Sequence, residues 1–310
     1  MKKVFIDGSA GTTGLRIVER LSSRNDIELI KLTEELRKDP DARREALNSA
    51  DIAFLCLPDA ASIEAVSMIE NPNTVVLDTS TAHRTNPEWA YGFPELSKEH
   101  FDKVASSKRI AVPGCHASGF IALTYPLVEK GIISKDILLT CHSITGYSGG
   151  GKKMIAEYEG DERDVLLGAP RQYGISQSHK HLPEMTVVTG IKNKPIFSPI
   201  VADFYSGMEV TVPIFKSQLE GGYTLEDIKA VYKEKYNSDI VFYKDAADEG
   251  GFLSANAMSL KDSMEISAYG NDDRIILVAR YDNLGKGASG AALECMNISM
   301  GEKPSLMLDI

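Results

Sequence analysis

The 310-residue sequence is poor in cysteine: its four cysteines are scattered, with no C-x-x-C pair. So few cysteines do not make a disulfide framework, and they indicate a reducing cytoplasm. Long apolar runs are also missing. No stretch approaches the ~18 uninterrupted apolar residues of a membrane span, and the first residues lack a signal-peptide pattern. The sequence therefore predicts a cytoplasmic protein with no membrane partner.

The sequence also has fewer basic than acidic residues. The 34 lysine and arginine residues stand against 44 aspartate and glutamate residues, which gives a net charge of −10. Phosphate backbones require a basic face, so nucleic acid is not an expected partner. The length and the 43% hydrophobic content fit a two-domain enzyme that acts on a small molecule.

The first third of the chain alternates short apolar strands, such as KVFIDG, DIAFLCLP and TVVLDTS, with helical segments. This pattern predicts an α/β Rossmann-type dinucleotide-binding domain over 1–116, with a parallel sheet covered on both faces. Longer strands separated by turns follow, and they predict an α+β mixed-sheet catalytic and dimerisation domain over 117–283. The small-residue segment 284–310 is expected to form a C-terminal helix that returns to the first domain.

Three glycines, Gly8, Gly11 and Gly14, lie as G-x-x-G-x-x-G between the first strand and the first helix. Glycines at this position let the backbone approach a pyrophosphate, and the helix N-terminus offers N–H groups to the anion. Thr12 and Thr13 add hydroxyl donors. The usual fingerprint is G-x-G-x-x-G, so a glycine-rich turn that binds nothing is the alternative.

Basic residues follow the second strand. Arg37 and Lys38 are placed to meet a 2′-phosphate, which favours NADP(H) over NAD. Glu34 and Glu35, in the same segment, argue in the other direction.

Cys115 lies in VPGCHASGF, directly before a segment with helical apolar spacing. The helix is predicted to begin near Ala117, and its N-terminus would favour a thiolate through the macrodipole. Gly114 and Gly119 are expected to keep the site open to a bulky substrate. We therefore interpret Cys115 as a nucleophile and the other three cysteines as core residues.

A nucleophilic cysteine needs a proton partner, and SHKHLPEM supplies His179 and His181 with Glu184 close behind. On an extended segment, alternate positions direct both imidazoles to the same side. Glu184 would orient one of them, and Pro183 suits the first turn of a helix. Two ordinary surface histidines remain an alternative, and a zinc site built on H-x-H lacks further ligands. His116 is a candidate by adjacency alone.

Seven motifs, in order along the chain, resemble the N-acetyl-γ-glutamyl-phosphate reductase family in its short form. They are GSAGTTG, STAHRT, YGFPEL, PGC followed by Gly119, GYSGGGK, HKHLPEM and DNLGKGASGAA. The resemblance covers essentially the whole chain. It implies NADPH-dependent reduction of N-acetyl-L-glutamyl 5-phosphate to the 5-semialdehyde and phosphate through a cysteine thioester, in arginine biosynthesis. It also implies a homodimer or homotetramer.

The same resemblance assigns roles to individual residues. It implies that Cys115 is the nucleophile and that His179 is the acid–base residue. His181 and Glu184 belong to the same signature and are implied to bind substrate. Arg84, in STAHRT, is implied to hold the substrate's phosphate or carboxylate.

Asn283 and Gly285 match the family segment that returns to the cofactor domain, so the resemblance implies that they bind the cofactor. One motif departs from the family pattern. Short-form relatives typically read GCYPTG where this chain reads GCHASG. Tyr, Pro and Thr are thus replaced by His116, Ala117 and Ser118.

Two kinds of alternative stay open. Aspartate-semialdehyde dehydrogenase and the aminoadipate-type reductase of lysine synthesis share the architecture and the thioester route, and activity on each substrate would separate them. A non-catalytic Rossmann protein that senses NADP(H) belongs to a different class. It predicts tight cofactor binding without turnover.

Overall fold

The computed structural model describes residues 1–310, which form two compact units. The chain passes from unit 1 to unit 2 between Pro113 and Gly114 and returns to unit 1 at Ala291. The last two residues, Asp309–Ile310, belong to unit 2. The boundaries expected from the sequence, after residues 116 and 283, lie close to these crossing points.

Unit 1 is built on a six-stranded sheet in the order β2-β1-β3-β4-β6-β5, and every pair in it is parallel. All residues of β3 and β4 are buried, which is why these strands are continuously apolar or nearly so. The strands are β1 (Lys2–Asp7), β2 (Ile27–Ile30), β3 (Ile52–Leu55), β4 (Val75–Asp78), β5 (Ala90–Tyr91) and β6 (Arg109–Ala111).

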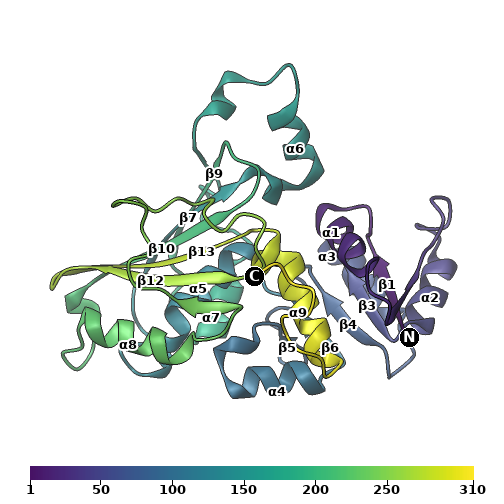
Figure 1. Ribbon diagram of the computed structural model, residues 1–310, viewed down its shortest axis with the longest axis horizontal. Coiled ribbons are helices and arrows are strands. Elements are labelled where there is room, and N and C mark those ends of the chain that lie inside the picture. Colours follow the sequence, from purple (N-terminus) through teal and green to yellow (C-terminus); the bar gives the residue numbers. More distant parts are fainter. The chain divides into compact units, whose positions relative to one another are not determined.

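Helices cover both faces of this sheet, which confirms the predicted Rossmann-type architecture (Figure 1). One face packs against α1 (Thr12–Leu21), α4 (Lys98–Ser106) and the C-terminal helix α9 (Gly290–Ser299). The other packs against α2 (Pro40–Ser49) and α3 (Asp59–Ser67). A short 3₁₀ helix, η1 (Pro94–Leu96), follows β5.

Unit 2 is built on a seven-stranded mixed sheet in the order β11-β12-β13-β10-β7-β9-β8. The sheet is mixed, as predicted, and it is largely antiparallel, since only β11–β12 and β7–β9 pair in parallel. The strands are β7 (Thr140–Gly146), β8 (Arg171–Gln172), β9 (Ile196–Ala202), β10 (Met208–Phe215), β11 (Val241–Tyr243), β12 (Met264–Gly270) and β13 (Arg274–Tyr281).

Side chains close in sequence stabilise one hairpin turn and one helix N-terminus in unit 2. Asn271 closes the β12–β13 hairpin, since its Oδ1 accepts the N–H groups of Asp273 and Arg274 at 2.9 and 3.0 Å. Thr224 caps α8 (Leu225–Lys235), and Asp227 completes the capping box.

The helices of unit 2 place the site. The helix α5 (Cys115–Glu129) packs on β10 and β13, α7 (Leu182–Thr189) packs beside α5, and α8 packs on β12. The helix α6 (Gly151–Glu159) lies at one end of the sheet (Figure 1), where its Tyr158 packs in a cluster with Val201 of β9. The short helical turns are η2 (Tyr147–Gly150), η3 (Val165–Gly168), η4 (Lys216–Gln218) and the π-helical η5 (Gly285–Ser289).

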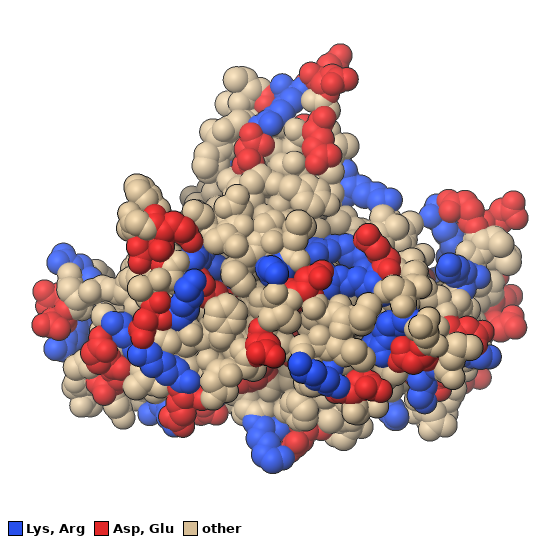
Figure 2. Space-filling model, viewed as in Figure 1, with Lys and Arg blue, Asp and Glu red and all other residues tan.

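None of the helices combines the length and hydropathy that a membrane span requires. On the face drawn in Figure 2, lysine and arginine side chains are interspersed with aspartate and glutamate side chains.

Candidate active site

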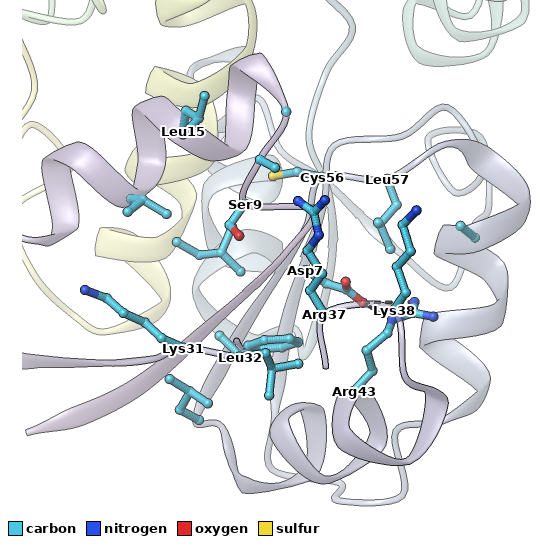
Figure 3. Close-up of a pocket in the computed structure, with 18 of the residues that line it drawn as sticks. Asp7, Ser9, Leu15, Lys31, Leu32, Arg37, Lys38, Arg43, Cys56 and Leu57 are labelled. Atoms are coloured by element: carbon cyan, nitrogen blue, oxygen red, sulfur yellow. Dashed lines mark hydrogen bonds and ion pairs between the residues drawn. The ribbon is translucent and has the colours of Figure 1, made fainter. Parts of the chain in front are cut away.

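Unit 1 contains a cavity of about 720 Å³ at the carboxyl ends of β1, β2 and β3, and the glycine loop lines it (Figure 3). Gly8 has φ +86°, and an added Cβ would lie 2.2 Å from the carbonyl oxygen of Cys56, so only glycine fits there. An added Cβ on Gly11 would meet nothing nearer than 3.4 Å. Gly11 is also the N-cap of α1, and no side chain caps this end.

The first-turn N–H groups of α1 are therefore available to a pyrophosphate at this end of the cavity. Thr12, Thr13 and Gly14 belong to α1 itself and are not among the residues that line the cavity.

Charged side chains surround the cavity (Figure 3). Arg37 forms an ion pair with Glu34, and Lys38 lines the cavity next to it. Arg43 donates from Nε and Nη2 to Oδ2 of Asp7, both at 3.0 Å, and burial raises the pKa of Asp7. The uncapped helix start and these cations fit a dinucleotide with a 2′-phosphate.

In unit 2, Cys115 is half-buried and is the first residue of α5. Gly114 is the extended N-cap, so the helix begins earlier than the start predicted near Ala117. The N–H of Gly114 donates to Oε1 of the buried Glu184 at 2.8 Å, which ties the α5 N-terminus to α7. No side chain caps this end of α5, so the first-turn N–H groups of His116 and Ala117 can receive an anion at the helix start.

A tyrosine hydroxyl bonds two backbone groups in the first turn of α5. Oη of Tyr281 donates to the Cys115 carbonyl oxygen at 2.5 Å and accepts from the Gly119 N–H at 3.0 Å. These two groups are an i, i+4 pair of the helix backbone, and the hydroxyl bonds both of them. An added Cβ on Gly119 would lie 2.7 Å from this Oη and 2.6 Å from Cγ2 of Val210. Gly119 therefore makes room for Tyr281 and Val210, and the expectation that it keeps the site open to substrate is wrong.

His179 and His181 lie together, with ring centroids 4.8 Å apart. The segment is not extended as expected, because His181 is the N-cap of α7 and adopts a helical conformation. Pro183 lies in the first turn of α7, as predicted. The His181 N–H donates to Nδ1 of His179 at 3.2 Å, so neutral His179 carries its proton on Nε2. Burial lowers the pKa of His179 and favours this neutral form.

Strand β9 holds the loop that carries His179. Gln177 has φ +55° and bonds the backbone of Phe197 in both directions, at 2.8 and 2.9 Å. The Phe197 ring lies 5.1 Å from the His179 ring and 5.3 Å from the His116 ring. The loop thus packs its imidazole against a residue of the sheet.

His116 lies at the centre of this cluster and is 3% exposed. Its Nδ1 lies 2.7 Å from Oγ of Ser143, and its Nε2 lies 2.6 Å from Oη of Tyr173. Its ring lies 5.8 Å from that of His179. Sequence reasoning considered His116 by adjacency alone and missed Ser143, Tyr173 and Tyr281, because no spacing links these residues to the cysteine.

Arg84 is buried in unit 1 and makes backbone contacts. Its Nε donates to the carbonyl oxygen of Val112 at 2.9 Å, and its Nη2 donates to that of Thr79 at 2.8 Å. It therefore joins the carboxyl ends of β4 and β6, just before the chain reaches Cys115. A role in holding substrate phosphate or carboxylate stays a prediction.

Asn283 and Gly285 lie in unit 2. Asn283 accepts from the Gly207 N–H at 2.9 Å and donates to Oγ of Ser148 at 3.0 Å. Gly285 opens the π-helical turn η5. Their assignment to the cofactor site stays a prediction.

The other cysteines differ from Cys115 in their surroundings. Cys141 and Cys295 are fully buried, as expected of core residues. Cys56 is half-buried and lines the unit 1 cavity, and burial raises its pKa to about 12. All four cysteines are free thiols, and no group of three His, Cys, Asp or Glu side chains has an arrangement suited to a metal ion.

Two family models match the two units. Residues 3–104 match the semialdehyde dehydrogenase NAD-binding domain, and residues 115–283 match the semialdehyde dehydrogenase dimerisation domain. Proteins named N-acetyl-γ-glutamyl-phosphate reductase from Brucella ovis and Brucella canis are each 44% identical to this chain over 307 residues. The alignments cover 97% of this chain and 99% of each relative.

Solved structures share the fold. A probable aspartate-semialdehyde dehydrogenase from Pseudomonas aeruginosa has a TM-score of 0.73 at 15% identity, covering 96% of this chain and 98% of that one. The Candida albicans aspartate-semialdehyde dehydrogenase with NADP has a TM-score of 0.67 at 18% identity, with the same two coverages. At these identities the likeness concerns the fold alone.

Proposed function

The chain belongs to the semialdehyde dehydrogenase family, and we propose that it reduces N-acetyl-L-glutamyl 5-phosphate to N-acetyl-L-glutamate 5-semialdehyde and phosphate with NADPH. The relatives that carry this activity in their name align over nearly the full length at 44% identity. The aspartate-semialdehyde dehydrogenase from Pseudomonas aeruginosa resembles the chain in fold at only 15% identity. That likeness supports aspartate β-semialdehyde as the substrate of this chain less strongly.

The observation that carries the proposal is the placement of Cys115. It is the one half-buried cysteine at an uncapped helix N-terminus, and the His116, His179 and His181 rings gather in the same unit. The α5 macrodipole and the first-turn N–H groups favour a thiolate at this position. A thiolate displaces phosphate from an acyl phosphate and forms a thioester.

The same N–H groups serve the next step. The tetrahedral states that form and collapse at Cys115 carry negative charge on the substrate oxygen, and each well-placed N–H donor stabilises such charge by roughly 3 kcal/mol. His179, with its proton on Nε2, donates a hydrogen bond to that oxygen. As the thiohemiacetal collapses, the C–S bond breaks, the aldehyde leaves and the thiolate is regenerated. Glu184 fixes Gly114 and so holds the cysteine at the helix start.

The unit 1 cavity would hold the cofactor. NADPH, when bound, supplies the hydride for reduction of the thioester. The Gly8–Gly11 loop and the α1 N-terminus would receive its pyrophosphate, while Arg37 and Lys38 would receive the 2′-phosphate. Asn283 and Gly285 are proposed to contact it from the second unit, and Arg84 is proposed to bind the substrate's phosphate or carboxylate.

We also propose a homodimer or homotetramer, since the family model matched by unit 2 is a dimerisation domain. Four free thiols suit a reducing cytoplasm, where we place the enzyme. The product is proposed to serve arginine biosynthesis.

The direct test is reduction of NADP⁺ by the enzyme with N-acetyl-L-glutamate 5-semialdehyde and phosphate, or arsenate in place of phosphate. Aspartate β-semialdehyde is the comparison substrate. Turnover preferring the N-acetylated substrate supports the proposal, and a preference for aspartate β-semialdehyde reassigns the substrate. Tight NADPH binding without turnover of any semialdehyde would indicate a sensor instead.

The covalent step has its own test. Mass spectrometry of the enzyme mixed with the acyl phosphate, in the absence of NADPH, should find an acyl adduct on Cys115. Cys115→Ser should lose nearly all turnover while it still binds NADPH, because a serine hydroxyl is a far weaker nucleophile at neutral pH. Full activity in this variant would exclude the thioester route.

A further inference from the structure

A hydrogen-bonded chain of three side chains lies next to the nucleophile and has no part in the proposed reaction. Ser143, on β7, is fully buried and bonds Nδ1 of His116 at 2.7 Å. His116 is the residue after Cys115 and bonds Oη of Tyr173 through Nε2 at 2.6 Å. Both ring nitrogens of His116 therefore have partners, and this imidazole links the sheet to the loop that carries Tyr173.

The imidazole of His116 does not titrate in the range where the enzyme would work. Burial, with a contribution from nearby His179, lowers the pKa of His116 to about 3. A neutral imidazole has one donor nitrogen and one acceptor nitrogen. If Ser143 donates to Nδ1, then Nε2–H donates to Tyr173, and the phenolic proton of Tyr173 is left for another acceptor.

The Tyr173 ring belongs to the same cluster, since its centroid lies 6.1 Å from that of the His179 ring. Burial and the charge of the Cys115 thiolate raise the pKa of Tyr173, so its hydroxyl stays protonated. The backbone N–H of Tyr173 donates to the carbonyl oxygen of Pro199 at 3.0 Å, which fixes the loop against β9. The residue is half-buried, so part of it remains accessible to a ligand.

We infer that Tyr173 is a further substrate-binding residue of the Cys115 site, donating a hydrogen bond to an oxygen of the acyl substrate, and that His116 is its positioning residue. The inference rests on the proposed function, because it requires an acyl group at Cys115. Ser143 fixes the imidazole, and the imidazole fixes the direction of the phenol. The short-form pattern has a tyrosine at position 116, which has no pair of ring nitrogens to bridge Ser143 and Tyr173.

Four variants test the chain of contacts. Tyr173→Phe removes the hydroxyl alone. His116→Asn has an amide near the position of Nδ1 and loses the contact to Tyr173, whereas His116→Gln has an amide near the position of Nε2 and keeps that contact. Tyr232→Phe is the matched control: its buried hydroxyl donates to the Leu123 carbonyl oxygen of the same helix at 2.6 Å.

The assay is kcat/KM for oxidation of N-acetyl-L-glutamate 5-semialdehyde with NADP⁺ and phosphate. Tyr173→Phe and His116→Asn should each lose on the order of 10- to 100-fold, as expected for one hydrogen bond to the reacting substrate. The double variant should lose no more than either single variant, since both remove the same interaction. His116→Gln should retain most of the activity, and KM for NADP⁺ should stay unchanged in all of them.

Two results would overturn this inference and leave the proposed function intact. One is a Tyr173→Phe enzyme with the kcat/KM of wild type or of Tyr232→Phe. The other is an acid limb of the pH–rate profile that moves in His116→Asn, because this would make His116 a proton carrier. A wild-type enzyme with no turnover of the semialdehyde would overturn the proposed function first, and the inference with it.

Discussion

Tyr281→Phe is the sharpest perturbation that the structure offers, because it removes one oxygen atom from the helix that carries the nucleophile. That atom bonds the Cys115 carbonyl and the Gly119 N–H. Each buried hydrogen bond contributes about 1 kcal/mol net, so the variant should lose about 2 kcal/mol of stability if the first turn keeps its shape.

Loss of these two bonds has a chemical consequence, because Tyr281 then no longer holds the Cys115 carbonyl group and Cys115 can shift with it. A displacement of ~1 Å at a reacting atom costs on the order of 100-fold in rate. We therefore expect kcat of Tyr281→Phe to fall on the order of 10- to 100-fold, with little change in NADPH binding, since Tyr281 lies in unit 2 and the glycine loop in unit 1.

The assay combines the urea unfolding midpoint with the rate at which iodoacetamide alkylates Cys115 across a pH series. Tyr236→Phe is the matched control, since its hydroxyl donates to the Ala122 carbonyl oxygen of the same helix at 2.7 Å. The control should lose about 1 kcal/mol and keep its alkylation profile. Wild-type alkylation and kcat in Tyr281→Phe would refute the argument that this hydroxyl positions the nucleophile.

We make four further predictions, on cofactor binding, on the proton carrier and on the pH dependence of stability. Gly11→Val should abolish NADPH binding, measured by fluorescence titration, and leave the fold intact, since an added Cβ meets no atom nearer than 3.4 Å; Gly8→Ala should instead lower the unfolding midpoint. Arg37→Ala should reduce the preference for NADPH over NADH in kcat/KM, and an unchanged ratio would assign the 2′-phosphate to another residue. His179→Asn should lower kcat on the order of 10²- to 10⁴-fold and flatten one limb of the pH–rate profile, whereas a larger loss in His181→Asn would transfer the role. Because burial lowers the pKa of His116 to about 3, the unfolded chain binds more protons than the folded chain below pH 6.5, the ordinary pKa of histidine. Wild type should therefore lose about 1.4 kcal/mol of stability per pH unit below that value, and His116→Asn should show a shallower slope in urea unfolding at several pH values; equal slopes would contradict the assignment.

Local patterns carry much of the fold. The sequence predicts the apolar strands of unit 1, and the Thr224 cap and the Asn271 hairpin also depend on neighbours within a few residues. The prediction that α5 begins near Ala117 is wrong, because it relies on apolar spacing alone. The N-cap role of Gly114 leaves no trace in that spacing.

Contacts between distant parts of the chain account for what the sequence could not predict. Cysteine and histidine are reactive residue types, so the sequence alone predicts roles for Cys115 and His179 without knowledge of their surroundings. Tyr281 lies 162 positions from Gly119, and Tyr173 lies 57 positions from His116. Neither tyrosine differs from an ordinary core aromatic until the sheet and the loop are assembled.

The contacts of His116, Ala117 and Ser118 show that GCHASG is compatible with the same chemistry as GCYPTG. Ser118 keeps the hydroxyl and donates from Oγ to the Gly114 carbonyl oxygen at 3.1 Å, a bond that threonine can also make. His116 is accommodated because both of its nitrogens have partners. Ala117 brings a gain, since proline has no N–H and alanine has one. This N–H lies in the uncapped first turn of α5, so this chain has one more donor for negative charge at Cys115 than the short-form pattern provides.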